Sequence, residues 1–288
     1  MPFVIIAGEK LHYHYHRGAL QPKAPPLVLL HGAGGSLMHW PGELRRLSDH
    51  EVYALDLPGH GRSGGRGRTE IGAYTEIVRE LADALKLPAF VLGGHSMGGA
   101  IALEFALRYG GRLAGLILVG TGARLRVAPE ILTGIRNDSE SVTALLAEWA
   151  HGEHVDPNLQ RIYLRRLREV DPQVLAGDFL ACDAFDRRAD VAAIAVPALV
   201  ICGDADRMTP VKYSQFLAEH ISGAQLMIVP GAGHMAMLEP HSRLVITNAV
   251  RQFLERLPLL PSAADRGAGS DTVIRRDFPS IERIGDPC

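Results

Sequence analysis

Short apolar runs alternate with amphipathic segments along most of this chain. Residues 27–30 and 113–120 are continuously apolar, which is typical of parallel strands buried on both faces. Segments with helical spacing follow most of these runs, so the pattern predicts an α/β fold with a mostly parallel sheet. Strands are expected at residues 3–7, 11–16, 27–30, 52–55, 89–92, 113–120, 196–203 and 225–229. Helices are expected up to about residue 47, over 69–87, from residue 99, and up to residues 221 and 257.

The pattern changes between residues 123 and 193. This stretch is Leu- and Arg-rich and amphipathic with helical spacing, and it contains no strand-like run. Because it is inserted between two predicted strands, we expect a helical cap over the carboxyl edge of the sheet. The sequence therefore predicts a core of residues 1–122 and 194–260, a cap of 123–193, and a poorly ordered tail of 261–288 rich in polar and small residues.

Two histidine groups raise the question of a metal site. His12, His14 and His16 alternate along a predicted strand and share one face. The favoured interpretation is a solvated face of an edge hairpin, with the intervening tyrosines turned inward, rather than a metal site. His151 and His154 flank a glycine at a spacing too short for a zinc motif, so a polar helix end is the better interpretation.

Composition narrows the choice of partners. The chain has 288 residues, 47% of them hydrophobic, and a formal net charge of -2, so neither nucleic acid nor an anionic membrane surface is an expected partner. No apolar run reaches the roughly 18 residues that span a membrane, and the start lacks a basic leader, so no stable membrane insertion is expected. Three widely separated cysteines favour a cytoplasmic protein. For the oligomeric state, the sequence is compatible with a monomer and with a homodimer.

Candidate chemistry centres on Gly94-His95-Ser96-Met97-Gly98. This G-x-S-x-G stretch lies between a predicted strand and a predicted helix, which is the context of a nucleophile elbow. The alternative, a glycine-rich turn that contains serine by chance, does not explain the small residues on both sides of Ser96. A second glycine-rich loop, residues 31–36, lacks the lysine of a phosphate-binding loop, so we interpret it as a backbone anion hole.

At this point the chain resembles the α/β-hydrolase family over residues 3–257, and in particular its carboxylesterase-like serine hydrolases with a helical cap. The resemblance implies an eight-stranded, mostly parallel sheet flanked by helices. Five motifs carry it in the family's order: His31-Gly32, Asp56-x-Pro-Gly-x-Gly-x-Ser63, Gly94-x-Ser96-x-Gly98, Gly203-x-x-Asp206-x-x-x-Pro210 and Gly233-His234.

The resemblance implies a catalytic triad and an oxyanion hole. Ser96 is the nucleophile, His234 its general base, and Asp206 the acid that orients the histidine. Asp204 is the competing acid, but Asp206 matches the family's position and Asp204 is interpreted as a loop cap. The N–H groups of Ala33 and Met97 are the expected oxyanion donors. This chemistry requires no metal or organic cofactor, and kcat/KM should rise with pH as the histidine becomes neutral.

The expected substrate is a small-molecule ester with a short to medium acyl chain. Gly34, Trp149 and Met235 are the residues predicted to line its pocket, with Met97, Met237 and Leu238 adding apolar wall. A C–C or enol-lactone hydrolase acting on an acidic substrate is the main alternative, with the cap arginines Arg124, Arg126 and Arg136 as its candidate clamp. A cofactor-free perhydrolase or lyase and a non-enzymatic receptor on the same fold complete the alternatives.

Overall fold

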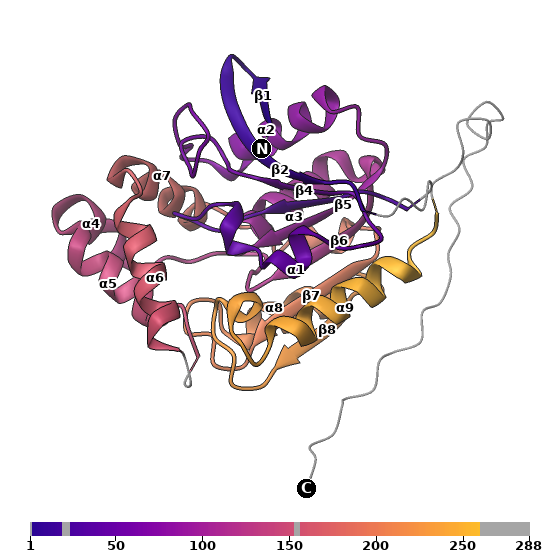
Figure 1. The fold of residues 1–288 in the computed structure, drawn as a ribbon. Coiled ribbons are helices and arrows are strands. Elements are labelled where there is room, and N and C mark those ends of the chain that lie inside the picture. Colours follow the sequence, from indigo (N-terminus) through magenta and orange to yellow (C-terminus); the bar gives the residue numbers. More distant parts are fainter. Residues whose placement is uncertain (1, 19–23, 153–155, 260–288) are drawn as a thin grey trace, which may run out of the picture.

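The computed structural model describes residues 2–18, 24–152 and 156–259 (Figure 1). The predicted tail of residues 261–288 and His154 lie outside these residues. The described part of the chain contains eight strands in one sheet, in the order β1-β2-β4-β3-β5-β6-β7-β8. The strands are β1 (Phe3–Ile6), β2 (Glu9–His16), β3 (Leu27–Leu30), β4 (Val52–Leu55), β5 (Phe90–His95), β6 (Leu113–Val119), β7 (Ala198–Gly203) and β8 (Gln225–Val229).

Neighbouring strands are parallel from β4 through β3, β5, β6 and β7 to β8. At the other edge, β1 pairs antiparallel with β2, and β2 pairs antiparallel with β4. The predicted eight-stranded, mostly parallel sheet is therefore confirmed. All four residues of β3 and all six of β5 are buried, as expected for central strands covered on both faces. Parallel neighbours place their carboxyl ends along one edge, and the loops that leave this edge carry the predicted site residues.

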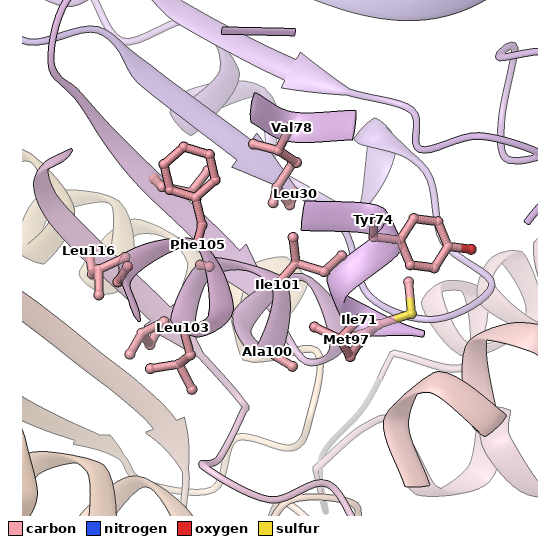
Figure 2. Packing of buried hydrophobic residues seen from close by; sticks show 14 of the residues in the cluster. Leu30, Ile71, Tyr74, Val78, Met97, Ala100, Ile101, Leu103, Phe105 and Leu116 are labelled. Atoms are coloured by element: carbon pink, nitrogen blue, oxygen red, sulfur yellow. The ribbon is translucent and has the colours of Figure 1, made fainter. Parts of the chain in front are cut away.

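Helices cover both faces of the sheet, and the two cores follow the alternation of side chains along β3. Val28 and Leu30 belong to one cluster with residues of α2 and α3, whereas Leu27 and Leu29 belong to a second with residues of α1 and α9. Figure 2 shows the first cluster, in which Leu30 lies among side chains of α2 and α3. The flanking helices are α1 (Gly42–Arg45), α2 (Ile71–Ala84), α3 (Met97–Tyr109), α8 (Val211–His220) and α9 (Arg243–Arg256).

Between β6 and β7 the chain forms a group of helices at one end of the sheet (Figure 1). An aspartate caps the amino end of three of them and accepts a hydrogen bond from a first-turn N–H. Their apolar faces, including Ile131, Leu146 and Phe179, join the second core cluster, so this cap is packed on the core. Its helices are α4 (Pro129–Asn137), α5 (Ser139–Trp149), α6 (Pro157–Arg168) and α7 (Pro172–Asp183). Short 3₁₀ turns lie at Leu37–His39, Gly110–Arg112, Val191–Ala193 and Ala236–Leu238.

Two local predictions are wrong. The segment after the glycine-rich loop is not one helix up to residue 47 but a 3₁₀ turn followed by the short α1, because Pro41 interrupts the pattern. The histidine face of the hairpin was predicted to be solvated, but His12 is buried. Its Nδ1 lies 2.7 Å from Asp56 Oδ2. Tyr15, predicted to turn inward, is 38% exposed. The twist of the hairpin and a carboxylate partner for His12 override simple alternation.

Asp56 organises the loop after β4. Its Oδ1 accepts from the N–H of Leu37, and its Oδ2 accepts from the N–H of Arg62. Ser63 Oγ donates to the carbonyl of Asp56. No helix in the described part of the chain is long and apolar enough to cross a membrane.

Candidate active site

Ser96 occupies the sharp turn between β5 and α3. Its backbone adopts φ 53° and ψ -116°, a region that non-glycine residues rarely enter and that costs about 1–3 kcal/mol. Two hydrogen bonds hold the turn: the N–H of Ser96 donates to the carbonyl of Val119, and Thr121 Oγ1 donates to the carbonyl of Ser96. The end of β6 and the loop that follows it thus restrain the strained residue through both its N–H and its carbonyl.

The glycines around Ser96 are required by close backbone approach. A Cβ on Gly94 would lie 2.1 Å from the carbonyl oxygen of Gly98, and a Cβ on Gly98 would lie 2.5 Å from the carbonyl oxygen of Leu30. Real Cβ atoms do not come this close to backbone oxygens. The elbow therefore seats the start of α3 directly on the end of β3.

His234 and Asp206 form a buried pair on the loops after β8 and β7. His234 Nδ1 lies 2.9 Å from Asp206 Oδ2, and Thr209 Oγ1 donates to the same carboxylate oxygen. Asp206 Oδ1 accepts from the N–H groups of Met208 and Thr209. Although burial opposes ionisation, His234 and these donors lower the pKa of Asp206 below its ordinary value. An ionised Asp206 places the proton of His234 on Nδ1 and leaves Nε2 as an acceptor.

The structure brings Ser96 and His234 to one cavity of about 190 Å³ that also contacts Gly32, Ala33 and Thr209. Among the described residues, no hydrogen bond joins Ser96 Oγ to His234 Nε2. Catalytic hydrogen bonds of this kind often tighten only when substrate binds. The other candidate acid, Asp204, is exposed and accepts from the N–H of Gly231. This hydrogen bond connects the loop after β7 to the loop after β8. Asp204 makes no hydrogen bond to His234.

Two N–H groups are free to act as anion donors beside Ser96. Neither the N–H of Ala33 nor that of Met97, the first residue of α3, has a hydrogen-bond partner among the described residues. The Ala33 loop is held by its neighbours: His31 Nδ1 and the N–H of Gly35 both donate to the carbonyl of Gly32, while His31 Nε2 accepts from Leu57. These bonds fix one neutral tautomer of His31, and burial lowers its pKa to about 4.

The cavity wall differs from the prediction. Trp149 lines the cavity, but Gly34 and Met235 do not. The side chains of Met97, Met235 and Met237 are fully buried in the protein core, because each follows a tight turn that points it inward. Cap residues form the apolar wall instead. They are Leu125, Val127, Ala128, Ile131, Leu146, Trp149, Tyr163, Leu167, Phe179 and Cys182.

Three arginines were candidates for an anion clamp, and only Arg126 contacts the cavity. Arg124 lies 3.7 Å from Asp186 in an ion pair, and Arg136 is exposed on α4. Arg207, which the sequence did not indicate, also lines the cavity and stacks its guanidinium over Trp149 at 5.5 Å. Arg207 also forms an ion pair with Glu148 at 3.0 Å, whereas Arg126 has no ion-pair partner among the described residues.

Buried imidazoles surround the site. His39 and His95 both line the cavity, and each has a buried Nδ1 without a hydrogen-bond partner. Burial lowers the pKa of His39 to about 3 and holds the pKa of His95 well below its ordinary value. Both rings are therefore neutral, and neither adds a cation beside His234.

Sequence reasoning missed three residues that hold the site together. Thr209 bridges Asp206 and His234. Asp178 of the cap and Glu239 after β8 are buried carboxylates that accept from loop N–H groups. A signal existed for Asp178, since a single acid within the apolar run of α7 needs a partner. No group of three metal-ligating side chains occurs within residues 2–18, 24–152 and 156–259.

Comparison with known proteins places the site in context. Residues 27–246 match the sequence profile of a family described as the alpha/beta hydrolase family. A monoacylglycerol lipase of Mycolicibacterium smegmatis is 32% identical over 72% of this chain and 79% of its own length. The acetyltransferase component of an acetoin cleaving system of Pseudomonas putida is 31% identical, and the match spans only 60% of that protein.

Solved structures show the same architecture. A thermophilic esterase superposes with a TM-score of 0.78 at 32% identity, covering 90% of this chain and 98% of its own. The enol-lactonase of Burkholderia xenovorans LB400 superposes with a TM-score of 0.80 at 27% identity, covering 88% of this chain and 100% of its own.

The elbow packing can be tested with a pair of glycine substitutions. Gly98→Ala places a methyl group against backbone carbonyls of β3, so we expect a loss of about 1–3 kcal/mol or more in the free energy of unfolding. Gly110→Ala is the matched control, because that position is helical and has open space around it; a change within about 0.5 kcal/mol is expected. Urea unfolding measures both. Equal stability of the two variants would contradict the packing described for the elbow.

The neutral histidines make stability depend on pH. Burial lowers the pKa of six imidazoles, those of His14, His31, His39, His50, His95 and His151. A lowered folded-state pKa gives stability that is present above about pH 6.5 and lost as pH falls toward the folded value. His60 has the opposite sign: although burial works against its charge, Asp178 raises its pKa, so its contribution is lost as pH rises.

Because the pKa is lowered for six imidazoles and raised for one, the urea midpoint should fall between pH 6.5 and 4.5, with a net uptake of at least about two protons on unfolding. His39→Phe should reduce that uptake by about one proton. His220→Asn removes an exposed imidazole as a control. A midpoint that stays constant over this range would show that the buried rings are not neutral.

Proposed function

Because the chain belongs to the alpha/beta hydrolase family and is a hydrolase, we propose that it is a serine esterase acting through Ser96, His234 and Asp206. The observation that carries the proposal is the convergence of three features on one cavity. These are the strained Ser96 turn, His234 with its buried partner Asp206 behind it, and the loop of Ala33, whose N–H is free.

The proposed reaction proceeds through an acyl-enzyme. His234 Nε2 takes the proton of Ser96 Oγ as that oxygen attacks the ester carbonyl carbon. The carbonyl oxygen becomes an oxyanion and is stabilised by the N–H groups of Ala33 and Met97. Collapse of this intermediate breaks the bond to the alcohol oxygen, which takes the proton from His234. Water, deprotonated by His234, then attacks the acyl carbon and releases the acid and free Ser96.

Cavity size favours a short acyl chain. The volume of about 190 Å³ lies below the roughly 300–1,000 Å³ of pockets for drug-sized ligands. The apolar cap wall favours an uncharged hydrocarbon chain over a polar one.

An enol-lactone hydrolase or another hydrolase of acidic substrates is the second candidate function, and Arg126 favours it. This side chain lines the cavity, is exposed, and has no ion-pair partner among the described residues. An unpaired guanidinium at a substrate cavity suits a carboxylate on the substrate. The structural similarity to an enol-lactonase supports the same candidate.

A panel of p-nitrophenyl esters from acetate to palmitate tests the esterase proposal. We expect the highest kcat/KM with short acyl chains and a steep decline for the long ones, because the cavity cannot hold them. Ser96→Ala should lower activity by about 10³-fold or more, with an unchanged thermal midpoint as evidence of folding. Full activity of the serine variant would remove the basis of the proposed mechanism.

The choice between neutral and acidic substrates rests on Arg126. Ethyl hydrogen succinate and ethyl butyrate have acyl chains of equal length and differ by one carboxylate. If the substrate is acidic, the wild type should prefer the succinate ester, and Arg126→Ala should reduce that preference by about tenfold. Arg124→Ala is the matched control, because Arg124 pairs with Asp186 outside the cavity. A preference for butyrate in all three proteins would favour the neutral-ester proposal.

A further inference from the structure

One carboxylate of the cap lies against the loop that carries Ala33. Asp178 is on α7 and is fully buried. Its Oδ2 accepts from the N–H of Gly34 at 2.8 Å, and Gly34 directly follows the proposed oxyanion donor Ala33. This is the only hydrogen bond described from the cap to that loop. The carboxylate therefore restrains the peptide unit next to the donor.

Packing reinforces this contact independently of the hydrogen bond. Leu175 lies one helical turn before Asp178, so both side chains share a face of α7. A Cβ on Gly34 would lie 2.6 Å from a terminal carbon of Leu175 and 3.1 Å from one of Leu167. Gly34 itself has φ 60°, a left-handed conformation that glycine tolerates. The loop thus has no room to move toward the cap.

The core supplies two further donors that hold the carboxylate in place. Tyr74 Oη donates to Asp178 Oδ1 at 2.6 Å, and His60 Nε2 lies 2.8 Å from Oδ2. In Figure 2 the ring of Tyr74 packs within the core cluster and its hydroxyl points out of it. His60 Nδ1 faces the carbonyl of Pro58, so both ring nitrogens face acceptors and only the imidazolium satisfies both.

From this geometry we infer that Asp178 is a positioning residue for the oxyanion hole, acting through Gly34 on the N–H of Ala33. The inference rests on the proposed esterase function. Gly34 and His60 contact Oδ2 and Tyr74 donates to Oδ1, so both oxygens of the buried carboxylate are held and it cannot rotate away from the loop. Its removal leaves the N–H of Gly34 without an acceptor in a buried place, and the loop relaxes to find another.

The consequence is specific to the oxyanion. A displaced Ala33 N–H weakens stabilisation of the tetrahedral intermediate, whereas the substrate in its ground state loses little. A displacement of about 1 Å is enough to cost on the order of 10²-fold in rate. If Asp178 had a purely structural role, its removal would lower the free energy of unfolding. It would not weaken the binding of the tetrahedral intermediate more than the binding of the substrate.

Two variants remove the acceptor, and the first of them also leaves no isolated buried charge. In Asp178→Leu combined with His60→Leu, both ions are replaced by apolar side chains, which proteins often tolerate. Asp178→Ser is a second, smaller change whose side chain is too short to reach Gly34. Asp178→Asn is the rescue variant, because its amide oxygen can accept from Gly34 while its amino group donates to Tyr74. Tyr74→Phe is the control that removes only the Oδ1 partner.

The measurements are kcat and KM for p-nitrophenyl acetate, and inhibition by a short trifluoromethyl ketone and its unreactive methyl ketone analogue. The trifluoromethyl ketone adds to Ser96 Oγ and places an oxyanion in the hole. For the variants without the acceptor we expect kcat to fall by about 10- to 100-fold and the Ki of the trifluoromethyl ketone to rise by a similar factor. KM and the Ki of the methyl ketone should change less than about twofold, and Asp178→Asn and Tyr74→Phe should retain most of the activity.

The outcomes separate the two proposals. If the wild type neither hydrolyses the ester nor binds the trifluoromethyl ketone, the proposed esterase function is wrong. If the wild type does both and a folded variant without the acceptor keeps its kcat and its affinity for the trifluoromethyl ketone, the role given to Asp178 is wrong. Equal losses of affinity for both ketones would likewise overturn it, since they indicate a general distortion of the cavity.

Discussion

The contact between the start of α3 and the end of β3 is the constraint on which the site depends. Gly98 lies so close to the backbone of β3 that no side chain fits between them. This close approach holds Ser96 in a conformation it would otherwise leave, at a point where Gly32 of the Ala33 loop lies against its side chain. Nucleophile and anion donors are thus positioned by one backbone contact.

The order of elements and the position of the Ser96 elbow could be predicted from the sequence because they follow from local rules, whereas the roles of Asp206 and His234 followed from the resemblance to a known family. Continuous apolar runs identify buried parallel strands, and the G-x-S-x-G spacing identifies the elbow without tertiary information. The competing acids Asp204 and Asp206 could also be ranked, and the structure places Asp206 next to His234. Whether Ser96, Asp206 and His234 act as a triad remains a proposal.

The cavity wall could not be predicted in the same way. Met235 and Met237 follow the proposed base in sequence, yet tight turns direct them into the core. Leu146 and Phe179, which were not predicted, reach the cavity only because the cap helices pack over it. His12 was misplaced for a related reason, since its partner Asp56 is distant in sequence. Side-chain direction in loops and caps depends on contacts that periodicity does not encode.

A second buried carboxylate joins the cap to the other side of the site. Glu239 Oε1 accepts from the N–H of Gly152, at the end of α5, and from the N–H of Gly233, the neighbour of His234. A Cβ on Gly152 would lie 2.1 Å from the carbonyl oxygen of Gly231. Caps of related hydrolases are therefore not interchangeable modules on this core. A chimera that receives a foreign cap must carry a glycine at the position of Gly152 and an acid facing Gly34; otherwise a side chain collides with the carbonyl of Gly231, and the N–H of Gly34 is left unpaired.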